Sequence, residues 1–291
     1  MSDCVFELAD VCFAYPSHPA LDALSLRIKR GDRVALLGAN GSGKSTLLRL
    51  LDALYFPASG ELKAFGKLLS EAAMADDETN DAFRRRVGLV FQNPDVQIFN
   101  PTVFDEVAFG PLQLGWTKAE ITQRSDAILA RFAIGHLKDR APHRLSGGEK
   151  KRVALASVLI LEPEVLLLDE PTAALDPESQ GEVIRFLIES RGTGRTIVTA
   201  THDLDIVEDI ADYVFVLADG KLAGAGTPSE ILADEALLRR THLVHAHWHR
   251  HADGSTHSHL HAHGHQHNHG ETRSAADGTE ALPSTRNPRG A

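Results

Sequence analysis

The feature that most restricts the fold of this chain is the octapeptide GANGSGKS at residues 38–45. It fits the pattern G-x-x-x-x-G-K-[ST] and lies between a β-type run, VALL, and an amphipathic run, TLLRLLDAL. Glycines let the backbone N–H groups wrap around a phosphate, and the start of the following helix adds partial positive charge. A glycine-rich turn capped by serine is the alternative, but the flanking strand and helix favour a phosphate-binding loop.

This loop predicts specific contacts with ATP. Lys44 would reach the β- and γ-phosphates, and Ser45 would bind Mg²⁺. The residues expected to contact the nucleotide here are Gly38, Ala39, Asn40, Gly41, Ser42, Gly43, Lys44, Ser45 and Thr46.

A second apolar strand, VLLLDE at residues 165–170, ends in two carboxylates. Because ligands bind at the carboxyl ends of strands in a doubly wound sheet, Asp169 is expected to hold Mg²⁺ and Glu170 to polarise the attacking water. An Asp-Glu pair after a strand is often only a solvated turn. The phosphate loop upstream makes that alternative the weaker one.

The stretch LSGGEKKR at residues 145–152 has the pattern of a helix start. Ser146 is the expected N-cap, and Glu149 would complete a capping box. Glycines in the first turn weaken a helix by roughly 1 kcal/mol each. That cost is understandable if exposed N–H groups must approach an anion.

Composition excludes several classes of function. The 291 residues are 43% hydrophobic, which suits one large α/β domain with an appendage. The formal net charge of -10 argues against nucleic acid as a partner. Cys4 and Cys12 match no metal or disulfide pattern, which indicates a reducing, cytosolic compartment. The start of the chain lacks signal-peptide character, and residues 162–164 (EPE) interrupt the longest apolar region, so a membrane role would need a partner.

The order of patterns predicts the domain organisation. Residues 1–37 contain short β-type runs, and residues 88–92 are strand-like. Residues 93–145 are mostly helical, with Thr117 and Glu120 as a capping box at the start of the longest helix. From residue 146 the chain alternates between helices at 146–161, 178–190 and 203–211 and strands at 165–169, 195–200 and 213–218. Such alternation predicts a parallel sheet with helices on both faces.

The phosphate loop, LSGGE, VLLLDE, AALD and the histidine of THD occur in the order found in ATP-binding cassette (ABC) ATPases, which the chain resembles over about 240 residues. The resemblance implies an α/β ABC nucleotide-binding domain. Its parts are a P-loop NTPase core with a parallel sheet, an antiparallel β subdomain and a helical subdomain insert, followed here by a disordered His-rich tail. We therefore expect a cassette at residues 1–240, with the insert at about 93–145, and a tail at 241–291.

The resemblance also implies roles for residues at matching positions. Tyr15 would stack on adenine, although it could also be a core residue of the first strand. Gln92 would contact Mg²⁺ and the water, and His202 would contact the γ-phosphate. Asp176, in the D-loop, would cross the interface between two cassettes.

Two cassettes of this family close head to tail. Residues Ser146, Gly147, Gly148 and Glu149 of one chain would complete the ATP site of the other, and a homodimer is expected. Glu149 stands where many family members carry glutamine, but the capping box suggests that the charge is tolerated.

The stretch GLVFQNPDVQIFNPTVFDEVAFGPLQLG, residues 88–115, resembles the ATP-binding subunits of energy-coupling-factor importers. The implied partners are a transmembrane energy-coupling subunit and a substrate-binding membrane subunit, at the cytoplasmic face of the inner membrane. Asp95, Gln97, Phe99 and Phe104 would lie near the coupling surface, or else in a partly buried loop.

The end of the chain is rich in histidine, with twelve of the sixteen histidines at residues 242–269. Alternate positions carry His257, His259, His261, His263, His265, His267 and His269. Neutral imidazole binds Ni²⁺, Co²⁺, Zn²⁺ and Cu²⁺. These histidines are candidate ligands for Ni²⁺, Co²⁺ or Zn²⁺, and a solvated low-complexity tail is the alternative. The tail favours the cobalt/nickel branch of these importers.

We thus expect an ATP- and Mg²⁺-dependent ATPase that powers uptake of Ni²⁺ or Co²⁺ through separate membrane subunits. One alternative is the ATPase of a vitamin or zinc importer. Another is a metal-storage protein or metallochaperone with a nucleotide-controlled tail. A soluble ABC protein of translation or DNA repair fits less well, because the chain has one cassette, no long coiled-coil insertion and an acidic balance.

Overall fold

The structure is a computed structural model and describes residues 3–250 and 256–262. The described residues form three sheets. The first is antiparallel, with strand order β2-β1-β4-β5. Its strands are β1 (Cys4–Tyr15), β2 (His18–Lys29), β4 (Ser59–Ala64) and β5 (Lys67–Leu68). In β2, Leu24, Leu26 and Ile28 are buried and the residues between them are exposed, so the period of two places one face on the core.

The central sheet has six strands in the order β10-β9-β3-β8-β7-β6. Its strands are β3 (Arg33–Leu37), β6 (Val87–Val90), β7 (Val165–Asp169), β8 (Thr196–Thr201), β9 (Tyr213–Ala218) and β10 (Lys221–Gly226). All neighbours are parallel except β10, which pairs antiparallel with β9. Every residue of β3 and β7 is buried, as expected for central strands covered on both faces. The carboxyl ends of these two strands position the site.

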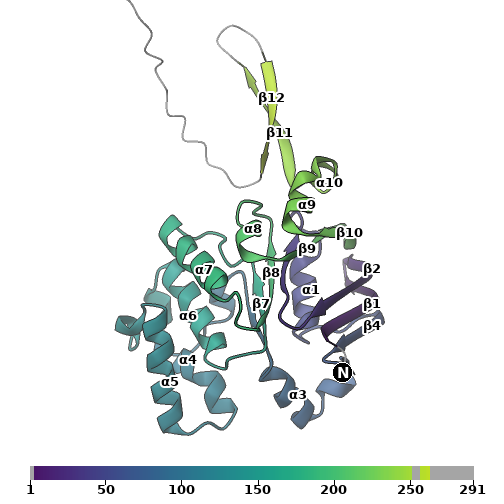
Figure 1. The fold of residues 1–291 in the computed structure, drawn as a ribbon. Coiled ribbons are helices and arrows are strands. Elements are labelled where there is room, and N and C mark those ends of the chain that lie inside the picture. Colours follow the sequence, from purple (N-terminus) through teal and green to yellow (C-terminus); the bar gives the residue numbers. More distant parts are fainter. Residues whose placement is uncertain (1–2, 251–255, 263–291) are drawn as a thin grey trace, which may run out of the picture.

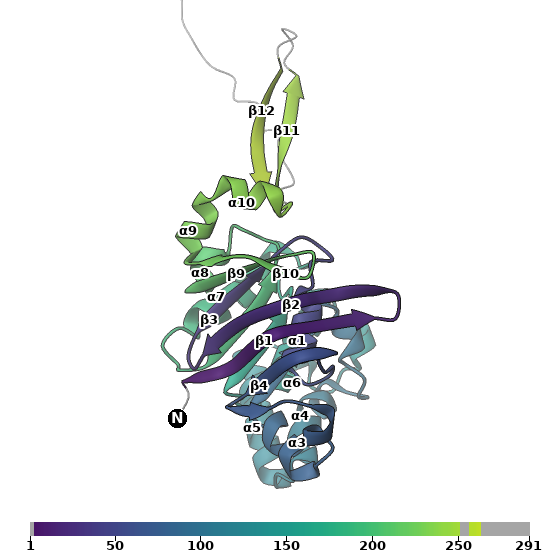
Figure 2. The same ribbon diagram turned by 90° about the vertical axis from the view of Figure 1, so that its right-hand side faces the viewer.

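Helices cover both faces of the central sheet (Figure 1). On one face, α1 (Lys44–Leu51) packs between this sheet and the antiparallel sheet, which lies in front in Figure 2. The other face is covered by α6 (Gly147–Leu159), α7 (Pro177–Glu189), α8 (Val207–Ile210), α9 (Pro228–Ala233) and α10 (Glu235–Arg240). The two apolar cores therefore lie on opposite sides of one sheet, and the fold confirms the expected ABC architecture.

A helical region with its own small core follows β6. It contains α4 (Val103–Gln113) and α5 (Lys118–Arg131), with 3₁₀ turns at η1 (Pro94–Val96), η2 (Gly135–Leu137) and η3 (Pro142–Arg144). The predicted capping box at Thr117 and Glu120 is present, and α5 is the longest described helix. The core of this region includes Val153 of α6, so the insert packs on the helix that begins with the LSGGE stretch.

Three local features differ from the sequence predictions or were missed by them. The short helices α2 (Glu71–Met74) and α3 (Asp77–Arg84) precede β6 and were not predicted. The predicted length of the helix at 203–211 was wrong, because only Val207–Ile210 is helical. Asp203 Oδ1 accepts a hydrogen bond from the N–H of Asp205, and this side-chain bond favours a turn at that point. The predicted parallel sheet also carries an antiparallel edge strand, β10.

The start of the predicted tail forms an antiparallel hairpin of β11 (Val244–Arg250) and β12 (Thr256–Ala262). The hairpin projects away from the packed layers in both views (Figures 1 and 2). Composition alone did not predict these strands. The last four predicted tail ligands, at residues 263–269, lie outside the described residues. No helix in the described part of the chain is long and apolar enough to cross a bilayer.

Candidate nucleotide-binding site

The phosphate loop connects β3 to α1, as the sequence predicts. Gly43 has φ of 104°, a left-handed conformation that favours glycine, and a Cβ atom there would lie 2.8 Å from the carbonyl oxygen of Ala20. Beside the loop lies a pocket of about 380 Å³. It is lined by Tyr15, His18, Pro19, Ala20, Asn40, Gly41, Ser42, Gly43, Lys44, Ser45, Thr46, Gln92 and Glu170.

The interior of the loop has the donors and the space that a phosphate group requires. Ser42 Oγ is buried and has no hydrogen-bond partner within the described part of the chain. A Cβ atom at Gly38 would lie only 2.3 Å from this oxygen, so glycine is needed there. Burying a hydroxyl without a hydrogen-bond partner costs free energy of folding unless a ligand supplies that partner. The loop therefore fits a phosphate by its chemistry.

Lys44 is buried at the base of this pocket. Its Nζ donates to the carbonyl oxygens of Gly38, at 2.6 Å, and Ala39, at 3.3 Å. It also lies 3.5 Å from Oε1 of Glu170. Burial lowers the pKa of Lys44, and the nearby Glu170 carboxylate opposes this shift. The ammonium group is thus held between the loop and a carboxylate.

Ser45 and Asp169 form the second polar contact of the site. Ser45 Oγ donates a hydrogen bond of 2.9 Å to Oδ1 of Asp169, which joins the start of α1 to the end of β7. Burial raises the pKa of Asp169, and the hydrogen bond from Ser45 opposes the shift. A hydroxyl and a carboxylate are hard oxygen ligands of the kind that Mg²⁺ prefers, so this pair fits the predicted cation.

Glu170 follows β7 in a left-handed conformation, with φ of 43°. Its N–H donates to the carbonyl oxygen of Ala200 at 2.9 Å, which ties this strained residue to β8. Its Oε1 lies 2.9 Å from Nδ1 of His202, a half-buried residue just after β8. The structure therefore brings together Lys44, Glu170 and His202, three of the residues expected at the nucleotide site.

Tyr15 lies at the edge of the pocket in a small aromatic group. Its ring contacts Phe13 edge-on at 5.2 Å and lies 5.3 Å from the ring of His18. Its hydroxyl lies 3.2 Å from Thr46 Oγ1 and accepts from Arg49 at 3.2 Å. Tyr15 thus packs within the chain and also lines the pocket. His18 was not predicted, although FAYPSH places it three residues after Tyr15.

Gln92 also lines the pocket and is exposed. Its backbone carbonyl and that of Phe91 accept hydrogen bonds from Nζ of Lys151, at 3.1 Å and 2.8 Å. Burial lowers the pKa of Lys151 to about 8, and Asp169 and Glu170 oppose the shift. No local pattern signals this lysine, because both Lys150 and Lys151 fit solvated basic residues near a helix start.

The remaining predicted residues form a second group outside this pocket. Ser146 and Glu149 make the predicted capping box of α6, and the hydrogen bond from the N–H of Ser146 lowers the pKa of Glu149. Gly148 packs against α7, so a Cβ atom there would lie 3.4 Å from Oδ2 of Asp176. Asp176 caps α7 by accepting from the N–H and hydroxyl of Ser179, and these bonds lower its pKa. None of residues 146–149 lines the pocket of the same chain.

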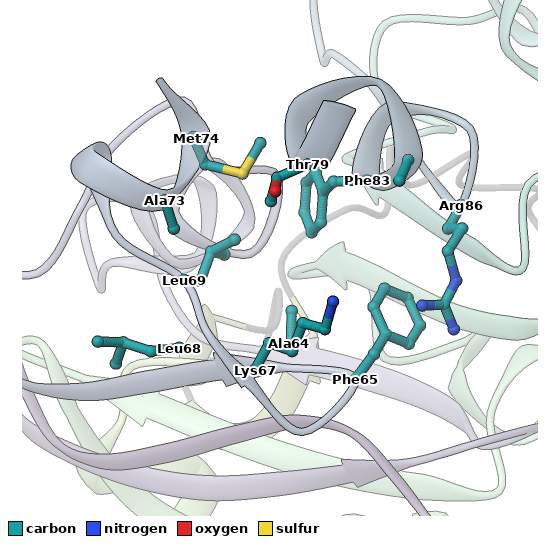
Figure 3. Close-up of a pocket in the computed structure, with 11 residues that line it drawn as sticks. Ala64, Phe65, Lys67, Leu68, Leu69, Ala73, Met74, Thr79, Phe83 and Arg86 are labelled. Carbon is teal, nitrogen blue, oxygen red and sulfur yellow. The ribbon is translucent and has the colours of Figure 1, made fainter. Parts of the chain in front are cut away.

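A different pocket, of about 110 Å³, lies between the β4–β5 hairpin and helices α2 and α3 (Figure 3). Apolar side chains such as Phe65, Met74 and Phe83 line most of it. The guanidinium group of Arg86 lies 3.3 Å from the ring centroid of Phe65 and donates to Glu164. Among the residues that the structure describes, Lys67 and Arg86 are the charged side chains around this pocket, and no carboxylate, histidine or cysteine lines it.

The predicted transition-metal residues are only partly placed. In the hairpin register, His257, His259 and His261 of β12 stand opposite His249, His247 and His245 of β11. Among the side chains that the structure describes, no group of three His, Cys, Asp or Glu residues could hold a metal ion.

Residues 21–173 match the family model described as ABC transporter. The chain is 60% identical to the nickel import ATP-binding protein NikO of Rhodobacter capsulatus over 242 residues, which is 82% of this chain and 95% of NikO. It is 44% identical to the energy-coupling factor transporter ATP-binding protein EcfA of Methanothermobacter thermautotrophicus, over 82% of this chain and 76% of EcfA.

Solved structures have the same fold. The protein cbiO1 from Clostridium perfringens, part of the ABC transporter complex cbiONQ, matches with a TM-score of 0.70 and 39% identity, covering 83% of this chain and 96% of cbiO1. A dimeric ATP-binding cassette in a post-hydrolysis state, bound to ADP and Pi, matches with a TM-score of 0.69 and 27% identity, covering 77% and 98%.

Proposed function

The chain belongs to the ABC transporter family as an ATP-hydrolysing subunit of an importer, and we propose that this importer takes up Ni²⁺ or Co²⁺ through separate membrane subunits. The proposal includes the roles of the site residues, the partner subunits and the location at the cytoplasmic face of the inner membrane. It also includes the division into a cassette at 1–240 and a His-rich tail at 241–291.

One observation carries the catalytic part of the proposal. Oε1 of Glu170 lies within 3.5 Å of both Lys44 Nζ and His202 Nδ1, at the edge of the sheet where the phosphate loop begins. Lys44 begins α1, after the loop that follows β3, whereas Glu170 and His202 directly follow β7 and β8. A phosphate-binding cation, a carboxylate and an imidazole at one point are the groups that phosphoryl transfer to water requires.

We propose the following roles for the residues of this site. Lys44 and the loop N–H groups bind the β- and γ-phosphates, and Ser42 Oγ gains the partner that it lacks within the chain. Glu170 orients the attacking water and accepts its proton, and His202 holds the Glu170 carboxylate and contacts the γ-phosphate. Ser45, Asp169 and Gln92 would hold Mg²⁺, which neutralises phosphate charge when bound. Tyr15 would stack on adenine at the open edge of the pocket.

The residues that line the pocket and the residues at the start of α6 form two separate groups, which supports a site shared by two chains. Ser146 and Gly147 are exposed at the start of α6 and do not line the pocket of their own chain. An exposed helix N-terminus attracts anions. We propose that Ser146, Gly147, Gly148 and Glu149 contact ATP held by the second copy, with Asp176 at the same interface.

Exposed apolar side chains before and on α4 support docking of a membrane subunit. Val96 and Phe99 are 68% and 67% exposed, and Leu112 of α4 is 61% exposed. Phe99 meets Phe109 edge-on at 5.1 Å. Exposed apolar groups of this kind are typical of interaction sites. Of the other predicted coupling residues, Asp95 pairs with Lys150, whereas Gln97 bonds within the chain to Phe91 and Ala154.

The choice of Ni²⁺ or Co²⁺ rests on the similarity to NikO and on the His-rich tail. Uptake of radioactive Ni²⁺ and Co²⁺ by cells that carry the whole gene cluster tests it. We expect the cells to take up at least one of these ions. This uptake should stop when the chain carries Glu170→Gln. Uptake of a vitamin or Zn²⁺ alone would favour the alternative importer, and metal binding without any uptake would favour a storage protein.

The tail is proposed to bind Ni²⁺, Co²⁺ or Zn²⁺ away from the catalytic site. The strand register supports this, because it places three pairs of histidines opposite one another, at positions two apart along each strand. The test is equilibrium dialysis of the full chain with Ni²⁺. Replacing His257, His259 and His261 with asparagine should weaken binding and leave basal ATP hydrolysis unchanged. Equal Ni²⁺ binding by both proteins would contradict the role of these positions.

A further inference from the structure

Lys151 is the most deeply buried ionisable side chain of α6, with 1% of its surface exposed. Its Nζ donates to the carbonyl oxygen of Phe91 at 2.8 Å and to that of Gln92 at 3.1 Å. These two carbonyls lie where β6 has ended and the glutamine segment begins. One side chain of α6 thus holds the backbone from which the Gln92 side chain extends.

The energetics indicate that this arrangement is not for packing alone. Burial of an ammonium group costs several kcal/mol unless other groups compensate. No carboxylate forms an ion pair with Lys151 among the described residues. Asp169 and Glu170 favour its charge only from a longer distance, and its hydrogen-bond partners are two backbone carbonyls. An apolar side chain of similar volume would fill the same space without this cost. The charge is therefore explained best by the two carbonyls that it positions.

Lys151 also lies close to the signature residues in the helix. It is one turn after Gly147, and residues four apart in a helix lie on the same side. Two further contacts join α6 to the same segment. Lys150 pairs with Asp95 at 2.6 Å, and Gln97 donates to the carbonyl of Ala154 at 3.2 Å. Lys151 is the most deeply buried of the three side chains that make these contacts, and its contact is the only one of the three that holds Gln92 itself.

We propose that Lys151 is a positioning residue that couples the placement of α6 to the placement of Gln92. This inference rests on the proposed function, in which the start of α6 contacts ATP on the second copy. A shift of α6 on closure would then move the backbone at Gln92 through a rigid buried contact. Hydrolysis would depend on closure through this lysine, as well as through the signature contacts.

The test compares the full-length variants Lys151→Met, Gln92→Ala and the double variant with wild type in steady-state ATP hydrolysis. If Lys151 acts through Gln92, Lys151→Met lowers kcat by about tenfold or more with little change in KM for ATP. The double variant should then be no slower than the slower single variant. Lys150→Met is the matched control, since this neighbour is more exposed and bonds Asp95, and it should keep nearly wild-type kcat.

Several outcomes would overturn the inference. One is an unchanged kcat for Lys151→Met, and another is a double variant whose loss equals the product of the two single losses. If Lys151→Met does not fold, Lys151→Gln replaces it, because its amide can still donate to one carbonyl and should retain part of kcat. Failure of the proposed function would appear differently, as wild-type protein that neither hydrolyses ATP nor dimerises with it.

Discussion

Nδ1 of His202 lies 2.9 Å from Oε1 of Glu170, so the residue after β8 contacts the residue after β7. When Nδ1 carries the proton, the carboxylate accepts it as a hydrogen bond. The Nε2 atom of the same ring can then face a phosphate oxygen. This contact orients Glu170 by a side chain from a neighbouring strand, and Lys44 approaches the same oxygen from the phosphate loop.

Glu170→Gln should bind ATP and close into a stable dimer but hydrolyse ATP at least about a hundredfold more slowly, because an amide cannot accept a proton from water. Release of phosphate measures turnover, and light scattering after size-exclusion chromatography in ATP measures the dimer. A variant that hydrolyses ATP at the wild-type rate would remove Glu170 from the proposed role.

Gly147→Ala and Gly148→Ala should have different effects although the two glycines are adjacent. A Cβ atom at Gly147 meets nothing within 4 Å, so this variant should keep its thermal stability. A Cβ atom at Gly148 would lie 2.1 Å from Ser179 Oγ and 2.9 Å from Ser179 Cβ, so that variant should lose about 1–3 kcal/mol. Thermal denaturation checks both.

The same pair separates stability from activity. If Gly147 faces ATP on the second copy, the stable Gly147→Ala variant should still lose most of its ATP hydrolysis. Full activity in that variant would argue against a signature contact at this glycine.

Mixing two inactive variants should restore activity if each ATP site is built from two chains. Lys44→Ala lacks the phosphate-binding lysine but keeps its signature residues, and Gly147→Asp has the opposite defect. In an equal mixture, dimers containing one of each would hold one complete site, which gives up to about a quarter of wild-type hydrolysis. Each variant alone is the control. A mixture as inactive as its components would indicate a site completed within one chain.

The sequence predicted the site largely because local rules and global fold agree there. Strand β7 spans the predicted residues 165–169, and Ser146 and Glu149 form the predicted capping box. These features depend on residues close in sequence. The contact of Lys151 with Gln92 joins residues that are 59 positions apart, and no local sequence pattern near either residue predicts it.

Other features were missed because tertiary contacts decide them. Helix α3 is polar on most of its surface and has one buried side chain, Phe83. It was not predicted, since its place depends on Arg84 reaching the end of α1. The pairing of β11 with β12 was missed for a similar reason, because alternating histidines give no apolar periodicity.

Asp52 should make the stability of the fold fall as pH rises toward neutrality. It lies at the C-terminal end of α1 and is 7% exposed, with Oδ2 at 3.2 Å from Nη1 of Arg84. Burial raises the pKa of Asp52 to about 7, and Arg84 opposes the shift. Between about pH 4 and pH 7 the unfolded chain releases this proton while the folded chain keeps it. The stabilisation from this group is therefore complete below about pH 4 and lost by about pH 7.

Asp52→Asn removes this titration and keeps an acceptor for Arg84. Its free energy of unfolding should rise relative to wild type by up to about 1.4 kcal/mol per pH unit between pH 5 and pH 7, with little further change above pH 8. Urea denaturation at a series of pH values measures this difference. Asp76→Asn is the matched control, because Thr79 lowers the pKa of exposed Asp76 and places its titration below this range. If the difference between Asp52→Asn and wild type did not change with pH, the Asp52 carboxyl would be ionised throughout, and Arg84 would outweigh the cost of burial.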